Sequence, residues 1–334
     1  MMRYKLTIAI PTYNRFNQIV NLIKHFIDNR NSYLLSFDFN LLIFDNSTNT
    51  ELVDYLSKAD FIKEKEWITY SKNNTNVGFD INILNLYVNS KTDYVWFFGD
   101  DDFPELDCFN YISEGLSHDP DILLLPFRQP LSLTNPQYQK DQFIETSIVS
   151  LDNILKVTYN TKITSFVIKR IVINYEKLIK YDLTGWMHLI IAFEVLQNSI
   201  QNKVISINEF CARALSDNDI KSMDWVPSAF LNFDRLLTHE YFHKYKKEKK
   251  IIQRCNDNYL SGIILTCWGA SGAWKVRGVS ILDYINFGKS YPFRNVLLKK
   301  PRYFFYWIIL KSNLSKYFVS HFNHISKTAG YDES

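Results

Sequence analysis

Short apolar runs alternate with segments of helical spacing over the first two thirds of the chain. Strands are predicted where β-branched and aromatic residues cluster and a proline or polar turn follows, at residues 5–11, 39–45, 67–71, 94–98, 121–127, 162–169 and 203–207. Apolar residues recurring every three or four positions predict helices at 19–27, 51–57, 79–89 and 186–197, with a start for the last near 182–184. Strands alternating with helices indicate an α/β fold with a mainly parallel sheet.

The pattern changes after about Ser216. Segments 230–250 and 258–268 have helical spacing, and the chain then mixes aromatic residues with cations from Tyr291 onward. We therefore expect two regions, residues 1–215 as an α/β domain and 216–334 as a mainly helical extension. Residues 128–150, between two predicted strands, form a long irregular segment of the kind that is often functional.

Charge divides the chain in a similar way. The 334 residues carry a formal net charge of +3, yet residues 240–334 contain 16 Lys/Arg against 6 Asp/Glu, a balance of 16 − 6 = +10, which leaves 3 − 10 = −7 for the rest. An acidic N-terminal part and a basic, aromatic C-terminal part suggest different partners for the two parts. A basic-aromatic segment suits the anionic surface of a membrane, and ordinary helix packing with a charged exterior is the alternative.

Composition narrows the class of protein. The four cysteines are far apart and form no CxxC pair, which argues against a zinc site or a disulfide framework and favours a reducing compartment. The N-terminus enters a strand pattern at once, leaving no room for a signal peptide. No apolar run approaches the roughly 18–20 residues that span a bilayer. We expect a cytoplasmic protein, associated at most with the inner face of the membrane.

Polar residues follow three of the predicted strands. Pro11–Arg15 follows the first, Asp45–Ser47 the second, and three aspartates, Asp100–Asp102, follow the strand at 94–98. In isolation the aspartates would be read as a solvated acidic turn. Because the carboxyl ends of parallel strands meet at one edge of a sheet, where ligands bind, the three signals together predict a ligand site.

The residues at this edge suit a nucleoside diphosphate and a metal ion. Asp100 and Asp102 form a D-x-D pair, and residues i and i+2 of an extended segment point the same way. One carboxylate can accept a hydrogen bond from a ribose hydroxyl while the other binds a hard divalent cation, whose remaining ligands are phosphate oxygens and water. Asp45 could accept an imide N–H of the base.

Four segments in order resemble the motifs of family 2 glycosyltransferases: Ile10–Arg15, Asp45–Ser47, Asn76–Asn82 and Trp96–Asp102. The resemblance covers roughly residues 4 to 215 and is strongest in the first 105. It implies the GT-A fold, a Rossmann-like, mixed but mainly parallel sheet flanked by helices. It also implies an inverting transferase that moves a hexosyl-type sugar from a UDP-linked donor to a glycan or lipid-linked acceptor in bacterial surface-polysaccharide synthesis.

The resemblance assigns roles to individual residues. Asp102 would bind the metal, normally Mn²⁺ or Mg²⁺, Asp100 would face the ribose, and Asp101 would be turned away. The residues it places around the nucleotide are Pro11, Thr12, Tyr13, Arg15, Asp45, Gly78, Asp80, Asn82, Asp100 and Asp101.

The catalytic base is the least defined element of the site. The family usually supplies it as a Glu-Asp pair before a Trp, near a helix start, and this chain reads Tyr181-Asp182-Leu183-Thr184-Gly185-Trp186-Met187-His188. Asp182 is the nearest carboxylate, and a helix N-cap is its alternative role. The imidazole of His188 could also act near neutral pH, although a lone His on an apolar helix is more often structural.

Other classes fit less well. The turn at Pro11–Arg15 lacks the Gly-rich fingerprint of a nicotinamide-binding enzyme. No recognition motif for nucleic acid accompanies the basic tail, so we expect no nucleic-acid partner. His239 and His243 have the spacing of a metal pair on a helix, but without a third ligand a solvated face is favoured. The serious rival is a non-catalytic nucleotide- or sugar-binding scaffold subunit of a polysaccharide assembly complex.

Overall fold

The fold is given by a computed structural model, which describes residues 5–34, 38–57, 66–128, 144–146, 162–182, 184–214 and 236–244. One compact unit comprises Met1–Ser216 and Thr238–Tyr245, and a second comprises Asp217–Leu237 and Lys246–Ser334. Nearly all described residues belong to the first unit. Of the predicted helical extension only residues 236–244 are described, and they include a short helix at Tyr241–Lys244; the rest of it and most of the predicted irregular segment 128–150 lie outside the described residues.

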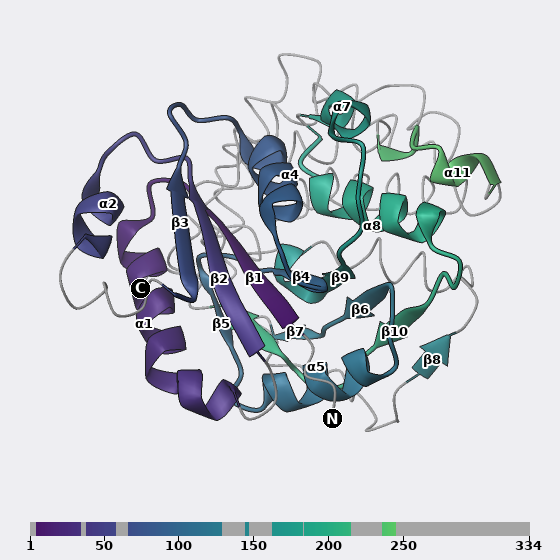
Figure 1. The fold of residues 1–334 in the computed structure, drawn as a ribbon, viewed down its shortest axis with the longest axis horizontal. Coiled ribbons are helices and arrows are strands. Elements are labelled where there is room, and N and C mark those ends of the chain that lie inside the picture. Colours follow the sequence, from purple (N-terminus) through teal and green to yellow (C-terminus); the bar gives the residue numbers. More distant parts are fainter. Residues whose placement is uncertain are drawn as a thin grey trace, which may run out of the picture. The chain divides into compact units, whose positions relative to one another are not determined.

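Strands and helices alternate from β1 to β4, and several of the later strands follow one another directly (Figure 1). The strands are β1 Lys5–Thr12, β2 Asp38–Asp45, β3 Ile68–Lys72, β4 Tyr94–Phe97, β5 Asp102–Pro104, β6 Ile122–Leu124, β7 Phe127–Arg128, β8 Ile144–Thr146, β9 Phe166–Lys169, β10 Val204–Ser206 and β11 Ala212–Ala214. The α-helices are α1 Phe16–Tyr33, α2 Glu51–Leu56, α4 Phe79–Asn89, α5 Cys108–Ser117, α7 Tyr175–Leu178, α8 Met187–Asn198 and α11 Tyr241–Lys244, and two 3-10 turns are η1 Ile163–Ser165 and η2 Ile179–Tyr181.

The main sheet is mixed but mainly parallel. Its eight strands lie in the order β3-β2-β1-β4-β9-β6-β10-β8. The pairs β3–β2, β2–β1, β1–β4 and β6–β10 are parallel, whereas β9 runs antiparallel to both β4 and β6, and β8 runs antiparallel to β10. A second, three-stranded sheet has the order β5-β11-β7. The predicted α/β fold class is confirmed.

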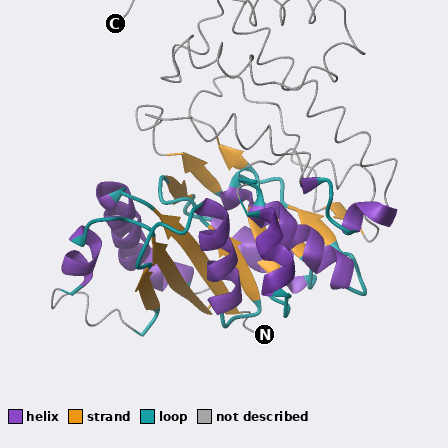
Figure 2. Ribbon diagram, turned by 90° about the horizontal axis from the view of Figure 1, so that it is seen from above, coloured by secondary structure: helices purple, strands orange, loops and turns teal. Residues whose placement is uncertain are grey.

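Helices cover both faces of the main sheet (Figures 1 and 2). Leu6, Ile8 and Ile10 of β1 alternate with Thr7 and Ala9, so they point to one face, where α1 and α5 complete a buried core. Helix α4 contacts β1 and β2, and α8 contacts both α4 and β9. Because both faces are covered, the inner strands are mainly apolar, and most of their polar residues lie near their ends.

Three predicted elements differ from the structure. The strand predicted at 121–127 is divided into β6 and β7, with Pro126, which has no N–H for a sheet ladder, just before β7. The strand predicted at 162–169 begins as the turn η1, and only Phe166–Lys169 is extended. The helix start predicted near 182–184 is wrong, because α8 begins at Met187 with Trp186 as its N-cap residue.

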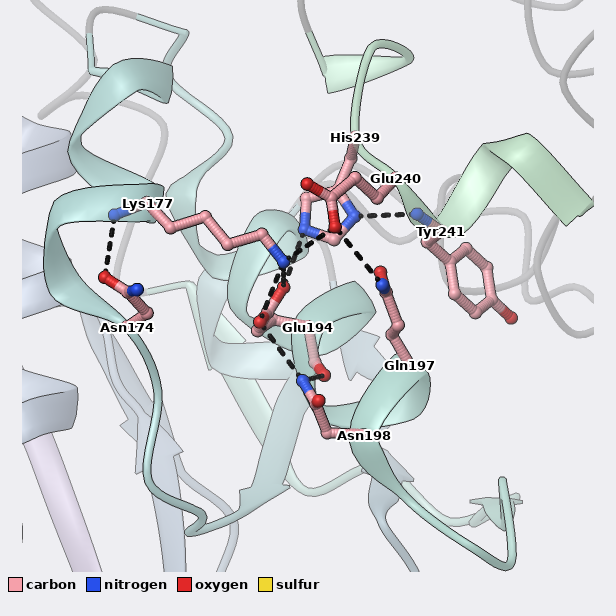
Figure 3. A network of polar contacts seen from close by, with 8 residues as sticks. All are labelled: Asn174, Lys177, Glu194, Gln197, Asn198, His239, Glu240 and Tyr241. Carbon is pink, nitrogen blue, oxygen red and sulfur yellow. Dashed lines mark hydrogen bonds and ion pairs between the residues drawn. The ribbon is translucent and has the colours of Figure 1, made fainter.

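A buried polar network joins α8 to the segment that contains α11 (Figure 3). The Glu194 carboxylate accepts hydrogen bonds from Lys177 Nζ at 3.0 and 3.2 Å and lies 3.2 Å from His239 Nε2. The Tyr241 N–H donates to His239 Nδ1 at 3.2 Å, so in the neutral ring the proton is on Nε2, facing Glu194. His239 is buried, which corrects the expectation that it lies on a solvated face.

Candidate functional site

Four parallel strands end in polar residues at one edge of the main sheet. The register pairs Thr12 of β1 with Asp45 of β2, and Asp45 with Lys72 of β3. On the other side of β1, the hydrogen bond from Phe98 N–H to Ala9 O carries the ladder past the end of β4, toward Asp100. The strand order therefore brings the polar residues predicted from the sequence to a common edge.

Asp100 connects the ends of β1 and β4. Its Oδ2 accepts a 2.7 Å hydrogen bond from Thr12 Oγ1, and its Oδ1 lies 2.8 Å from Arg15 Nη1. The same guanidinium nitrogen lies 2.7 Å from Asp101 Oδ2. Asp101, which the sequence predicts to be turned away, is partly exposed, and its carboxylate forms an ion pair with Arg15.

Asp102 lies in a second buried cluster. Its Oδ2 accepts a short hydrogen bond from Thr164 Oγ1, and Thr164 Oγ1 in turn accepts the Gly99 N–H at 2.9 Å. A Cβ added at Gly99 would lie 2.6 Å from Asp102 Oδ2, so a larger residue there would have to displace the Asp102 carboxylate. Sequence reasoning missed Thr164, since it lies in a segment predicted to be an ordinary strand and gave no motif signal.

Burial and mutual repulsion raise the pKa values of Asp100 and Asp102. Burial, followed by the charge of neighbouring Asp101, raises the pKa of Asp102 to about 7. Burial also raises the pKa of Asp100 to about 6, against the opposing effect of Arg15. A cation beside Asp102 would favour its charged form, since opposite charge lowers the pKa of a carboxyl.

The residues present fit a divalent cation only in part. Asp102 Oδ1 accepts no hydrogen bond from the described residues, whereas both oxygens of Asp100 are already bonded. No group of three His, Cys, Asp or Glu side chains in the described ranges is placed to hold a metal. The arrangement suits an ion that takes one carboxylate from the protein and its other ligands from phosphate and water.

Asp45 is buried at the end of β2, next to the first strand. Its Oδ1 accepts the Ser47 N–H at 2.7 Å, and its Oδ2 accepts the Tyr70 hydroxyl at 2.9 Å. Burial and the Asp45 contact raise the pKa of Tyr70, so its hydroxyl remains a donor. Each carboxylate oxygen has a second lone pair, which keeps Asp45 able to accept a further N–H.

Asparagine side chains organise the loop before α4. Asn82 Nδ2 donates to Phe44 O at 3.1 Å, and Asn73 Nδ2 donates to Asn46 Oδ1 at 2.7 Å and to Asn82 Oδ1 at 3.3 Å. Asn46 Nδ2 donates to Gly78 O at 3.2 Å. Asn82 is thus buried in a structural role, next to the predicted nucleotide loop.

Gly78 has φ +83° and ψ 166°, a conformation that is essentially restricted to glycine. A Cβ there would meet no atom within 4 Å, so the backbone angle, and not crowding, requires the glycine. Tyr13, 46% exposed, and Arg15, with a side chain that is 41% exposed, lie in the loop after β1, whereas Pro11 is buried within β1.

The Asp80 carboxylate points to the start of α8. It is buried, and its carboxylate accepts the N–H groups of Gly185 at 2.7 Å and Met187 at 3.0 Å, together with the Thr184 hydroxyl at 3.3 Å. Burial raises its pKa, and these backbone bonds oppose that shift. These three hydrogen bonds hold the start of α8, a structural role for Asp80 that the sequence does not predict.

The two base candidates lie in different environments. Asp182 is partly exposed and follows η2, five residues before α8 begins. His188 is buried beside Phe166 and Trp186, and neither ring nitrogen has a hydrogen-bond partner in the described part of the chain. Burial lowers the pKa of His188 to about 3. His188 does not suit the role of base, because a substrate hydroxyl must reach the ring.

Known protein families and solved structures were compared with this chain. The family described as Glycosyl transferase family 2 matches residues 7–184. Among solved structures, S. aureus TarS 1-349 is 17% identical, with a TM-score of 0.50, over 88% of this chain and 83% of that chain. Its complex with UDP-GlcNAc is 16% identical, with a TM-score of 0.50 and the same coverage of both chains.

A longer TarS structure is 15% identical, with a TM-score of 0.53, over 94% of this chain and 54% of that chain, so this chain spans about half its length. At these identities the likeness concerns the fold. No curated protein matched the chain. The family match covers 178 of the 334 residues, since 184 − 7 + 1 = 178, and it includes the whole polar edge from Thr12 to Asp102.

Proposed function

Because this chain belongs to glycosyl transferase family 2, we propose that it moves a sugar, of hexosyl type, from a nucleotide-sugar donor to a hydroxyl of a glycan or lipid-linked acceptor. Surface-polysaccharide synthesis is the proposed setting. The observation that carries the proposal is the buried Asp100/Asp102 pair at the end of β4, held by Thr12, Arg15 and Thr164.

The donor is proposed to be UDP-linked. TarS 1-349 has been crystallised with UDP-GlcNAc and with UDP, and it shares this fold. In this chain Asp45 would accept the imide N–H of uracil through a lone pair that Ser47 and Tyr70 leave open. Asp100 would accept the ribose hydroxyl, and the partly exposed side chain of Arg15 would lie near the phosphates.

Asp102 is the proposed ligand of Mn²⁺ or Mg²⁺. A bound divalent cation supplies charge that offsets the leaving nucleoside diphosphate. Thr164 holds one oxygen of Asp102 and so orients the other, which would face the ligand. Gly99 leaves the space that this geometry needs.

Asp182 is the proposed base. As the base of an inverting transfer, its carboxylate would take the proton from the acceptor hydroxyl while that oxygen attacks the anomeric carbon and the nucleoside diphosphate leaves from the opposite face. Its partial exposure leaves the carboxylate within reach of a substrate, in contrast to the buried ring of His188.

A thermal-shift panel of nucleoside diphosphates, each with Mn²⁺ or with EDTA, tests the donor site. We expect UDP with Mn²⁺ to raise the melting temperature most, because a ligand at 100 times its Kd stabilises the folded state by about 2.7 kcal/mol. EDTA should remove most of the shift. The donor proposal fails if no nucleoside diphosphate shifts the transition with either addition.

Turnover separates an enzyme from the scaffold alternative. An active transferase should also slowly hydrolyse its nucleotide sugar with Mn²⁺ when no acceptor is present. A protein that binds UDP but neither transfers nor hydrolyses any UDP-sugar would instead favour a non-catalytic scaffold subunit.

We also propose peripheral contact of the C-terminal region with the inner face of the membrane, supported by the balance of 16 Lys/Arg against 6 Asp/Glu in residues 240–334. Among the described helices, none has the length and apolarity to span a bilayer. At low salt, deletion from Tyr291 onward should reduce sedimentation with anionic liposomes at least threefold. Equal sedimentation of the full and shortened chains would refute this contact, and neutral liposomes are the control.

A further inference from the structure

Helix α8 begins without a cap from its own sequence. Its N-cap residue, Trp186, has no side chain that can accept a hydrogen bond from the first turn. The first N–H groups of a helix have no partner within the helix and require an outside acceptor when they are buried. Met187 is fully buried, so an acceptor for its N–H has to come from elsewhere in the fold.

Asp80 supplies that acceptor from the first turn of α4. Its Oδ1 takes the Met187 N–H at 3.0 Å, and its Oδ2 takes the Gly185 N–H at 2.7 Å. Gly185 has φ +74°, a left-handed conformation that glycine adopts without strain. A carboxylate is also the charge that the positive end of a helix favours.

Thr184 completes the contact. Its hydroxyl lies 3.3 Å from Asp80 Oδ2 and accepts the Trp186 N–H at 3.1 Å. One buried carboxylate therefore receives three donors from Thr184–Met187. This number of bonds fixes the turn much more firmly than one capping bond would.

Asp80 and its partners lie close in the chain to two parts of the proposed site. Asp80 follows Gly78 by two residues, in the loop assigned to the nucleotide, and Asp182 precedes Thr184 by two residues. Asp80 and Asp182 are also close enough for their charges to interact. The Asp80 carboxylate thus connects the first turn of α4 to the turn that follows Asp182, the proposed base.

We infer that Asp80 is a positioning residue, which holds the Thr184–Met187 turn in place. Through this turn it also positions Asp182 relative to the loop before α4, which is assigned to the nucleotide. The inference rests on the proposed function for the role of Asp182. The cap itself rests only on contacts within the fold. Asp80 acts through the turn and does not touch the substrate.

Amide hydrogen exchange of the protein without ligands tests the cap. Asn at position 80 keeps one acceptor oxygen but turns an NH₂ group toward the other donors, so Asp80→Asn should speed exchange at Gly185 and Met187 at least tenfold. Amides deeper in α8, such as Phe193, should change less than twofold. Unchanged exchange at Gly185 and Met187 would overturn the inference, whatever the protein does to nucleotides.

Kinetics with UDP-sugar and Mn²⁺ tests the positioning role. We expect Asp80→Asn to lower kcat at least tenfold while the KM for the donor stays within twofold, because the nucleotide contacts remain. A raised KM with unchanged kcat would return Asp80 to the nucleotide site and overturn the inference. Asp107→Asn, an exposed change on the same domain whose side chain caps nothing, is the matched control.

A milder variant covers the case in which Asp80→Asn does not fold. Thr184→Val keeps the volume of this buried residue and removes only its hydroxyl. It should speed exchange at Trp186 and lower kcat two- to fivefold with the donor KM unchanged, and wild-type values for both would overturn the inference. If wild-type protein binds UDP-sugar in no condition, the proposed function fails and the positioning role fails with it, while faster exchange in the variants still identifies the cap.

Discussion

The Asp102→Asn variant should transfer sugar at least about 100-fold more slowly than the wild type, with its fold intact. Asparagine fills the same space, and its carbonyl oxygen can still accept the hydrogen bond from Thr164. What it lacks is the negative charge that the proposed divalent cation requires. Removal of one electrostatic contact to a developing charge typically costs about two to three orders of magnitude in kcat.

Stability separates the loss of a ligand from the loss of the fold. The pKa of Asp102 is raised from its ordinary value to about 7, so above pH 7 the protein without ligand carries a buried charge that destabilises it. Asparagine removes this charge, and we expect the melting temperature of the unliganded variant at pH 8 to equal or exceed that of the wild type. The Mn²⁺-dependent part of the UDP shift should disappear.

Asp107→Asn is the matched control for Asp102→Asn. Asp107 is exposed, lies in the same stretch of chain and makes no side-chain cap to α5, so the same chemical change should leave turnover within twofold of wild type. Near-normal turnover in Asp102→Asn would remove the metal role from that residue.

The Glu194→Gln variant should lose about 2–4 kcal/mol of unfolding free energy at pH 7, measured by urea denaturation. Glu194 is buried and accepts hydrogen bonds from Lys177 and Asn198, while His239 Nε2 lies 3.2 Å away (Figure 3). Removal of one member of a buried charge network leaves its partners without compensation. Lys177 keeps its 3.1 Å contact to Glu240, which is why the expected loss stays below the largest values for buried pairs.

The same network predicts an acid-dependent loss of stability. The contact to His239 and the hydrogen bond from Lys177, against the opposing effect of burial, lower the pKa of Glu194 to about 2. A lowered carboxyl pKa contributes stability that is fully present above the unfolded value, near 4.5, and is lost as the pH falls toward 2. The difference in unfolding free energy between wild type and Glu194→Gln should therefore shrink from pH 5 to pH 3.

Glu176→Gln is the matched control for the stability experiment. Glu176 is exposed on α7, next to Lys177, and a surface change of this kind usually alters stability by less than about 0.5 kcal/mol. A Glu194→Gln protein as stable as this control at pH 7 would show that the network does not hold the α11 segment in place.

The pattern of residues was sufficient to predict the sheet and the polar edge at which its parallel strands end. Parallel strands covered on both faces must be apolar along their length, so Thr12, Asp45 and Asp100 stand out at the points where the strands end. Four strands that run in the same direction then bring those ends together, whichever side chains they carry. The α/β fold and the family followed from local information of this kind.

Partners of the site residues were not predictable in this way. Thr164 meets Asp102 from 62 residues away, and Asp80 meets Met187 from 107 residues away. Each pair depends on how one element packs against another, and the partners Thr164 and Met187 belong to no motif that marks them as such. The antiparallel placement of β9, which carries η1 to the end of β4, is likewise a property of the whole sheet.

Burial also decided which of the plausible groups remain available. In the sequence, Asp80 and His188 were suitable for the site by residue type. The tertiary structure places Asp80 under the start of α8 and encloses the ring of His188 between Phe166 and Trp186. The sequence by itself determined which residues gather at the edge of the sheet, because strand ends are local. Only the packing of α4 against α8 decided that Asp80 and His188 are buried, because burial and hydrogen-bond partners arise from contacts between distant segments.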